Sequence, residues 1–515
     1  MKKYWTSTLI IIITSATICF SQNSRPNEND RNALNIGSRL ELMIDSFLIE
    51  DYHGKIKYIL HNPQSKNVAI IHDSPWEDGT GTYHTIFKDN EIYRMYYISQ
   101  KKYVCYAESN DGINFIKPEL GIIEFNGSKA NNIIWEGGPV SHNLTPFKDS
   151  NPDCQPEHRY KAVGGLEPDG LFVLTSADGI HWSKLVDTPV ITDGWFDSQN
   201  IAFWDNQVNI YRLYYRDWHR QHPPQKLRGI MTDRVYRGIK TSTSPDFINW
   251  TSGQWLEFTN VHDNDTLLKE THLYTNSIKP YFRAPHIYIG FPVRYIERPF
   301  GESSRQLPNA EKHEKRMRNI QRENAQTDGL IITSRNGKKF NYWNESFLRP
   351  GLRSNNWVYG NNYIAWQLVE TRSDEPGNFP ELSLYATENV GTEFPKQLRR
   401  YSLRMDGFLS LNTPHSGGEI ITKPIRFEGN QLILNYSTSA SGSILVEIQN
   451  TDGKPIEGFS MLDCDEIYGD QLERIVTWQS KKELSDLQNK IIRIRIFLKD
   501  ADLYSFKFEA NYNSK

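Results

Sequence analysis

The stretch Ser176-Ala177-Asp178-Gly179-Ile180-His181-Trp182 decides the fold of this chain, because it recurs along the sequence. Related heptads begin at Ser109, Ser244 and Ser334, and a degenerate copy covers residues 387–394. In each clear copy an Asp or Asn is placed to cap backbone amides in a tight turn, and an aromatic residue closes the turn. Such self-similarity indicates a repeat architecture, and we interpret these turn residues as structural.

Each copy follows a short β-like run, and a second apolar run lies upstream of that run. For the stretch quoted above, these runs are Leu171–Thr175 and Arg159–Val163. Five repeats of three to four strands predict an all-β chain with a five-bladed β-propeller over residues 38–400. Alternating apolar runs separated by turn signals follow, and they predict a C-terminal β-sandwich over residues 405–512.

The first residues have the pattern of an export signal. Lys2 and Lys3 precede an apolar run, Leu9–Ile13, and small and polar residues follow. Residues 1–21 are therefore predicted to be a signal peptide, and the mature protein is predicted to be secreted or periplasmic. Lipid attachment at Cys19 is the less favoured alternative, because Ile18 is large for a residue before a lipidated cysteine. No later apolar segment is long enough to span a membrane.

The charge balance disfavours nucleic acid and anionic membranes as partners. The chain has 59 Lys and Arg against 62 Asp and Glu, a net charge of −3, and it has no strong basic run. Cys105, Cys154 and Cys464 lack the close spacing of a zinc site, so we expect free thiols and no metal. No redox or other cofactor is expected, and a structural calcium ion has no ligand motif to support it.

The repeat and the order of the two domains resemble the five-bladed propeller glycoside hydrolases. The resemblance is closest to family 32, in the group of families 32, 43 and 68, whose members pair an N-terminal propeller with a C-terminal β-sandwich. The Trp-Met-Asn-Asp-Pro-Asn-Gly, Arg-Asp-Pro and Glu-Cys motifs of family 32 are absent, so an activity on sucrose-type fructosides does not carry over. The resemblance implies a divergent hydrolase of an oligo- or polysaccharide, whose acids converge on the funnel of the propeller.

Glycoside hydrolysis needs one acid and one carboxylate that acts as nucleophile or base. We looked for acids just before the innermost strand of each repeat. Asp78 is the predicted nucleophile or base, Asp197 or Glu270 the acid, and Asp149 an orienting third carboxylate. Asp45, in the run Leu42–Ile49, is the next candidate, although we expect that run to close the ring by pairing with the last repeat.

Polar and aromatic residues near these acids are candidates for sugar binding, since a sugar needs fixed donors and flat apolar faces. They are His84, His142, Asn143, Asn200, Arg216, Asn276, Arg283, Trp357 and Asn361. A structural role for the arginines, or a core position for Trp357, stays open as the alternative.

Two other functions remain open from the sequence. A non-catalytic glycan-binding protein would have its acids far apart or exposed on the rim. A glycoside phosphorylase would have a single acid beside a cluster of Arg, Lys or His residues for phosphate. The residues that line the funnel distinguish these alternatives from a hydrolase.

Overall fold

In the computed structural model of the chain, 50% of the residues lie in β-strands and 6% in helices, which confirms the all-β class. It describes residues 33–220, 225–227, 230–232, 235–260, 271–307, 310–319, 324–481 and 483–510. The signal peptide predicted for residues 1–21 and the candidate acid Glu270 lie outside these residues.

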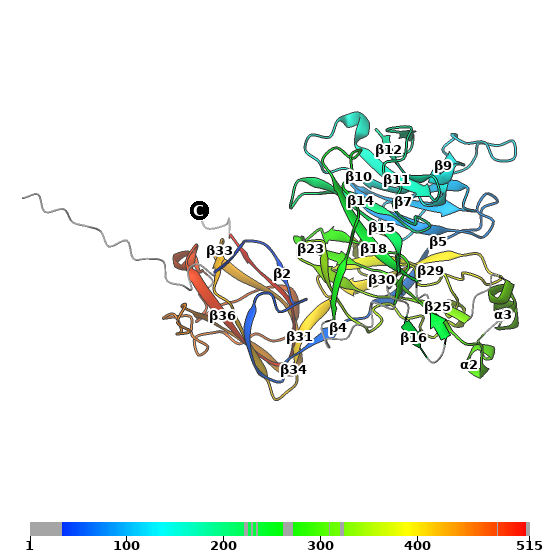
Figure 1. Cartoon of the computed structure of the whole chain (residues 1–515). Helices are drawn as coiled ribbons and strands as arrows, with labels where there is room; N and C mark the ends of the chain where they lie inside the picture. Colours follow the sequence, from blue (N-terminus) through cyan, green and yellow to red (C-terminus); the bar gives the residue numbers. More distant parts are fainter. Residues whose placement is uncertain are drawn as a thin grey trace, which may run out of the picture.

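Five sheets, which we call A to E, follow one another along the chain (Figure 1). Sheet A consists of β6 (Thr82–Asp89), β7 (Ile92–Ser99), β8 (Tyr103–Ser109) and β9 (Ile133–Glu136). Sheet B consists of β10 (Thr145–Lys148), β11 (Tyr160–Leu166), β12 (Gly170–Ser176) and β13 (Ser183–Lys184). Sheet C consists of β14 (Ile201–Asp205), β15 (Ile210–Arg220), β18 (Val235–Ser244) and β19 (Gln254–Trp255).

The last two sheets of this series combine distant parts of the chain. Sheet D consists of β20 (Glu257–Asn260), β22 (Lys279–Tyr281), β23 (Ala284–Gly290), β26 (Ile332–Ser334) and β27 (Lys339–Tyr342). Sheet E consists of β28 (Val369–Arg372), β29 (Pro380–Glu388), β30 (Gln397–Arg404) and β5 (Gln64–Ile71). The antiparallel pairing of β5 with β30 joins the start of the series to its end. The run Leu42–Ile49 does not make this closure, so our expectation for it was wrong.

Smaller elements extend these sheets. One hairpin pairs β16 (Gln225–Leu227) with β17 (Ile230–Thr232). A three-stranded sheet contains β21 (His272–Leu273), β24 (Val293–Arg298) and β25 (Asn324–Gly329). Two helices lie between β24 and β25, namely α2 (Glu302–Arg305) and α3 (Ala310–Asn319).

The recurring heptads form the same turn in four sheets. In the copy after β12, Asp178 Oδ1 accepts hydrogen bonds from the backbone N–H groups of Ile180 and His181. The corresponding Asp or Asn makes the same pair of bonds in the copies that begin at Ser109, Ser244 and Ser334. Gly179 has a φ of +81°, and its carbonyl accepts a bond from Tyr96 of sheet A. The turns therefore cap strands and also join neighbouring sheets.

A second repeated contact links each of three sheets to the next. Asp89, at the end of β6, accepts a 2.5 Å hydrogen bond from the hydroxyl of Tyr160 in sheet B. Asp149, after β10, accepts one of 2.7 Å from Tyr211 in sheet C. Asp205, at the end of β14, accepts one of 2.5 Å from Tyr288 in sheet D. Each carboxylate is also paired with a Lys or Arg side chain, so these acids hold neighbouring sheets together.

The rest of the chain forms a ten-stranded sheet with its own core. Its C-terminal strands are β31 (Leu409–Thr413), β32 (Gly418–Thr422), β33 (Ile425–Phe427), β34 (Gln431–Gln449), β35 (Asp470–Ile475) and β36 (Ile491–Glu509). Four N-terminal strands pair with them, namely β1 (Leu34–Gly37), β2 (Glu41–Leu42), β3 (Ile49–Gly54) and β4 (Lys57–Leu60). In Figure 1 these blue strands lie among the orange and red ones. Residues 38–60 therefore belong with the C-terminal sheet, and the domain boundary predicted at residue 38 is wrong.

Two ion pairs connect the C-terminal sheet to sheet D. Arg335, in the turn after β26, binds both oxygens of Asp45, at 2.9 and 3.1 Å. Arg283 Nε donates a 2.9 Å hydrogen bond to Asp406, which also accepts a bond of 2.7 Å from the Tyr281 hydroxyl. Asp45 and Arg283 thus have structural partners at this junction.

Candidate functional site

A cavity of about 490 Å³ receives residues from all five sheets or from the loops beside them, and we call it the central cavity. Its lining residues are Thr80, Gly81, Thr82, Tyr83, Ile98, Gln100, Lys101, His142, Asp197, Tyr274, Tyr359, Gly360, Tyr363, Thr387, Val390 and Lys396. Among these lining residues, which all lie in the described part of the chain, Asp197 is the one carboxylate. Lys101, Lys396 and His142 are the basic groups of the same wall.

Asp197 and His142 form a close pair at the wall of the central cavity. His142 Nε2 lies 2.7 Å from Asp197 Oδ1, and an Arg216 guanidinium nitrogen lies 3.9 Å from Asp197 Oδ2. Burial raises the pKa of Asp197, but the hydrogen bond from His142 and the charge of Arg216 outweigh it and bring this pKa below its ordinary value. Asp197 is therefore ionised at neutral pH, and its side chain keeps 36% of its surface exposed.

Buried amides hold the loop that carries Asp197. Asn143 Nδ2 lies 2.6 Å from the carbonyl of Phe196 and 2.8 Å from that of Ser198, on either side of Asp197. Asn200 Nδ2 contacts the same two carbonyls, at 3.0 and 3.1 Å. Asn143 directly follows His142 in the chain, so its amide fixes the two halves of the Asp197–His142 pair relative to each other. Asn143 and Asn200 are thus positioning residues and not part of the cavity lining.

Four tyrosines supply most of the aromatic surface of the cavity. The rings of Tyr274 and Tyr363 lie 5.5 Å apart between centroids, and those of Tyr274 and Tyr359 lie 5.9 Å apart. Burial raises the pKa values of Tyr83 and Tyr363 well above the ordinary value, so their hydroxyls stay neutral. Tyrosine rings with neutral hydroxyls offer both an apolar face and a hydrogen-bond donor, which suits a sugar ring.

Two arginines lie behind this wall. The guanidinium groups of Arg216 and Arg237 lie 5.2 and 4.9 Å from the centroid of the Tyr274 ring. Arg216 is only 3% exposed, and its Nε donates to the carbonyl of Trp195 at 3.1 Å. Its Nη1 has no hydrogen-bond partner among the described residues. Arg216 therefore adds positive charge beside Asp197, on the side away from solvent.

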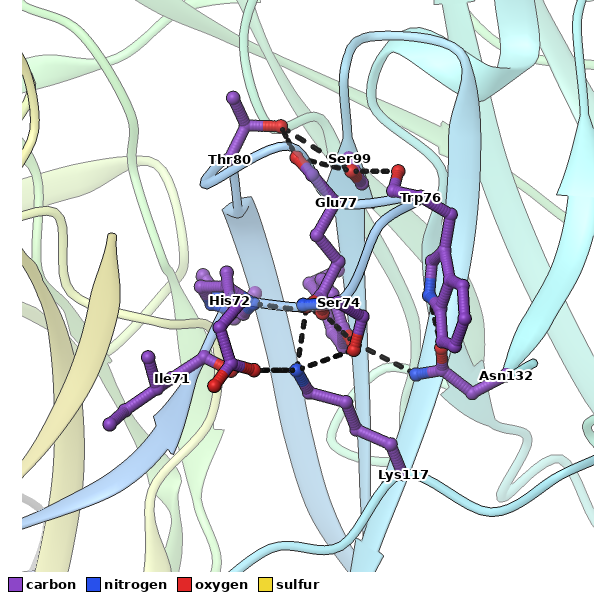
Figure 2. Close-up of polar contacts among 12 residues, drawn as sticks. Ile71, His72, Ser74, Trp76, Glu77, Thr80, Ser99, Lys117 and Asn132 are labelled. Carbon is purple, nitrogen blue, oxygen red and sulfur yellow. Dashed lines mark hydrogen bonds and ion pairs between the residues drawn. The ribbon is translucent and has the colours of Figure 1, made fainter. Parts of the chain in front are cut away.

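A buried network around Glu77 fixes the loop that leads into the cavity wall (Figure 2). Glu77 accepts hydrogen bonds from the Tyr97 hydroxyl at 2.5 Å, from Lys117 Nζ at 2.6 Å and from the backbone N–H of Ser74 at 2.8 Å. The carbonyl of Glu77 in turn accepts a 2.6 Å bond from the Thr80 hydroxyl. Glu77 is fully buried, so it positions residues Thr80–Tyr83 and does not contact a substrate.

Two neutral histidines complete the network. His72 Nδ1 lies 3.3 Å from Glu77, and His72 Nε2 lies 3.0 Å from His84 Nε2. Burial lowers the pKa of both imidazoles, and that of His84 falls well below its ordinary value. Burial raises the pKa of Glu77, but its bonds with His72, Lys117 and Tyr97 outweigh burial and lower this pKa to about 2. His84 is thus buried beside His72, outside the lining of the central cavity.

The predicted catalytic acids that the structure describes have different surroundings. Asp197 lines the central cavity, whereas Asp78 is exposed and is not part of its lining. At Asp78 the backbone has a φ of +48°, and the neighbouring Glu77 is the buried acid of this loop. Asp149 follows β10 instead of preceding it, and its carboxylate binds Lys161 and Tyr211 between sheets B and C. Asp149 therefore has structural partners, and the prediction that it orients the catalytic acids is wrong, whereas the role predicted for Asp78 stays a prediction.

Of the predicted sugar-binding residues, His142 alone lines the central cavity. Asn361 is buried, and its amide bonds to Asn355, Val358 and Val390 of its own loops. Asn276 Oδ1 accepts a 3.3 Å bond from the N–H of Ile278 and is also buried. Trp357 lines a separate cavity.

The residues that sequence reasoning missed are Lys101, Lys396 and the tyrosines of the wall. Tyr83 precedes the candidate His84, and Tyr274 lies two residues before Asn276, so their nearness in sequence to these candidates was a usable signal. Lys101 lies in the turn between β7 and β8, and no sequence pattern marks it.

The described residues contain no group of three or more His, Cys, Asp or Glu side chains that could hold a metal ion. Among the same residues, no helix is long and apolar enough to cross a membrane.

No protein-family model and no curated protein matches the chain. Several solved structures are similar to it. One described as a glycoside hydrolase is 11% identical, and the alignment covers 67% of this chain and 92% of that chain with a TM-score of 0.42. An N-acetylgalactosamine deacetylase from F. plautii, solved with blood group B trisaccharide, is 12% identical over 67% and 94% of the two chains, with a TM-score of 0.42.

An α-L-arabinofuranosidase from Clostridium thermocellum is 10% identical over 65% of this chain and 90% of that chain, with a TM-score of 0.35. The similar solved structures thus include proteins described as glycoside hydrolases.

Proposed function

We propose that the chain is a glycoside hydrolase that cleaves an oligo- or polysaccharide in the central cavity. Sheets A to E would be the blades of a five-bladed β-propeller, and the ten-stranded sheet would be folded as a β-sandwich. The observation that carries the proposal is Asp197, an ionised and partly exposed carboxylate in a cavity walled by tyrosines. With the signal peptide that the sequence predicts, the enzyme would act outside the cytoplasm.

The ionisation of Asp197 supports a role as nucleophile or base, instead of the role as acid expected from the sequence. A general acid must carry a proton at the working pH, whereas a nucleophile or base must not. The low pKa of Asp197 therefore fits attack on the anomeric carbon, or removal of a proton from the attacking water. His142 and Arg216 keep this carboxylate charged, and the tyrosine hydroxyls orient the sugar.

Glu270, the other candidate from the sequence, is then the proposed general acid. Glu270 lies outside the described residues, and its role stays a prediction. Substrates with good leaving groups need less help from an acid. The variant Glu270→Gln should therefore lose far more activity on natural glycans than on aryl glycosides, while Asp197→Asn should lose activity on both.

A phosphorylase is the second candidate. Its support is the composition of the described cavity wall, where one carboxylate stands beside Lys101, Lys396 and His142. Phosphate would replace water as the attacking group, and lysine and histidine would bind it.

Product analysis separates these functions. The purified chain is incubated with a panel of neutral and acidic glycans, in phosphate-free buffer and with added inorganic phosphate. A hydrolase releases free reducing sugars at the same rate in both buffers. Sugar 1-phosphates that form only with phosphate would identify a phosphorylase, and binding without any product would identify a glycan-binding protein.

A further inference from the structure

The central cavity carries positive charge in a protein whose net charge is −3. The described wall contributes the ammonium groups of Lys101 and Lys396 against the single carboxylate of Asp197. Arg216 adds a further charge from behind the wall, 3.9 Å from Asp197. A concave site with an excess of one charge concentrates ligands of the opposite charge. The wall is thus suited to a ligand with an anionic group beside the bond that is cleaved.

A second cavity, of about 450 Å³, has the same sign of charge. It is lined by Arg294, Ile296, Arg298, Gln326, Thr327, Asp328, Ser346, Arg349, Pro350, Gly351 and Trp357. Arg294 forms a bidentate ion pair with Asp328, at 2.9 and 2.6 Å, which neutralises that acid. Arg298 and Arg349 are exposed and have no ion pair among the described residues. Within the described part of the chain, these two guanidinium groups remain available to a ligand.

Trp357 gives the second cavity an aromatic face. Its side chain is 37% exposed, and its Nε1–H donates a 2.9 Å hydrogen bond to the carbonyl of Gly351. This bond fixes the indole in the wall of the cavity. An exposed, fixed aromatic ring beside arginines is the pairing that binds an anionic sugar, since the ring stacks on the apolar face and the guanidinium binds the acid.

One short segment of chain, residues 357–360, contributes to both cavities. Trp357 lines the second cavity, whereas Tyr359 and Gly360 line the central one. Thr327 of the second cavity accepts a 3.2 Å hydrogen bond from the N–H of Gly360 and donates one of 2.7 Å to the carbonyl of Asn361. Neighbouring residues of one hydrogen-bonded segment therefore line the two cavities.

We propose that the ligand is an anionic glycan, whose cleaved end occupies the central cavity and whose continuation is bound by Arg298, Arg349 and Trp357 in the second cavity. This inference rests on the proposed function for the identity of the central site. The anionic group is a carboxylate, as in a uronic acid, or a sulfate, and a guanidinium binds either one through paired N–H donors.

Binding to full-length Asp197→Asn protein tests the proposal without turnover. The probes are oligogalacturonate and its methyl ester, and a sulfated galactan and its desulfated form. At least one acidic probe should bind about tenfold or more tightly than its neutral counterpart, and added salt should weaken it. The pair that shows the difference identifies carboxylate or sulfate. Equal binding within both pairs, or no binding of either acidic probe, would overturn the proposal.

Charge-matched variants test the second cavity. The double variant Arg298→Ala/Arg349→Ala should weaken binding of the acidic probe about tenfold. The control Arg159→Ala/Arg426→Ala removes two exposed arginines that line neither cavity and should change binding little. Equal losses in the two variants would refute the second cavity. Wild-type protein that binds the acidic glycan without releasing product would instead refute the hydrolase function and leave this inference standing.

Discussion

The Asp197 carboxylate lies 2.7 Å from Nε2 of His142, although the two residues are 55 positions apart and stand before different sheets. Asn143 and Asn200 hold the backbone on both sides of Asp197. The pair is thus built into the junction of sheets B and C and opens onto the central cavity. An ionised acid in this fixed position is what the proposed reaction needs.

Replacing His142 should change the pH dependence of the reaction. The His142 side chain lowers the pKa of Asp197 by a hydrogen bond and by its charge. In His142→Leu this pKa should rise, so the acidic limb of the kcat/KM profile should move to higher pH. His142→Gln can still donate a hydrogen bond and should move the limb less. An unchanged limb in His142→Leu would show that Asp197 is not the group that must lose its proton.

Asp149 should matter for stability and not for the reaction. Asp149→Ala leaves the buried Lys161 without its counter-ion, which should cost about 3–5 kcal/mol of folding free energy. Thermal unfolding should show the loss, while kcat of the folded protein stays unchanged. Asp153→Ala, an exposed acid in the same loop, is the control and should have little effect on either quantity. A fall in kcat at unchanged Tm would return Asp149 to the catalytic set.

The His72–His84 pair should make the protein sensitive to mild acid. Both imidazoles have lowered pKa values in the folded state, whereas in the unfolded state they take up protons below about pH 6.5. Stability is therefore greatest above that pH and should fall below it, by up to about 1.4 kcal/mol per pH unit for each histidine.

Unfolding by denaturant between pH 7 and pH 5 checks this pH dependence. His84→Asn removes one titrating group and should flatten the decline. A decline of the same slope in wild type and variant would mean that other groups cause it. Glu77, whose pKa is lowered to about 2, adds its own loss of stability only below about pH 4.5.

The C-terminal sheet should not fold without the N-terminal strands. A fragment of residues 405–512 lacks β1 to β4, which pair with β33, β36, β32 and β31. We expect this fragment to lack a cooperative thermal transition. Adding residues 33–62 through a flexible linker should restore the transition. Cooperative unfolding of the fragment alone would show that the C-terminal sheet does not need its pairing with β1 to β4.

The sequence predicted the sheets because their turns are local. Each heptad contains the Ser, the Asp or Asn and the aromatic residue that make one turn, so pattern alone finds it. The pairing of β1 to β4 with the C-terminal sheet joins residues hundreds of positions apart, and no local pattern reports it.

For the site, we expected functional acids just before the first strand of each repeat, and this expectation held where the strand boundaries were predicted correctly. Asp197 does precede the first strand of sheet C, β14, and lines the central cavity. Asp149 was predicted to precede its strand but follows it. At that end of the strand, the acid accepts a hydrogen bond from a tyrosine of the next sheet. Asp78 and Glu77 are neighbours, and which of them is buried depends on a loop conformation with positive φ, which composition does not reveal.

The most direct test of the account is the activity of Asp197→Asn. The amide keeps the shape of the side chain and removes its charge, so the fold should persist with little change in Tm. We expect wild-type protein to release reducing sugar from an acidic glycan, and Asp197→Asn to lose this activity by about three orders of magnitude or more. Undiminished product release by the folded variant would contradict the claim that Asp197 is the catalytic carboxylate.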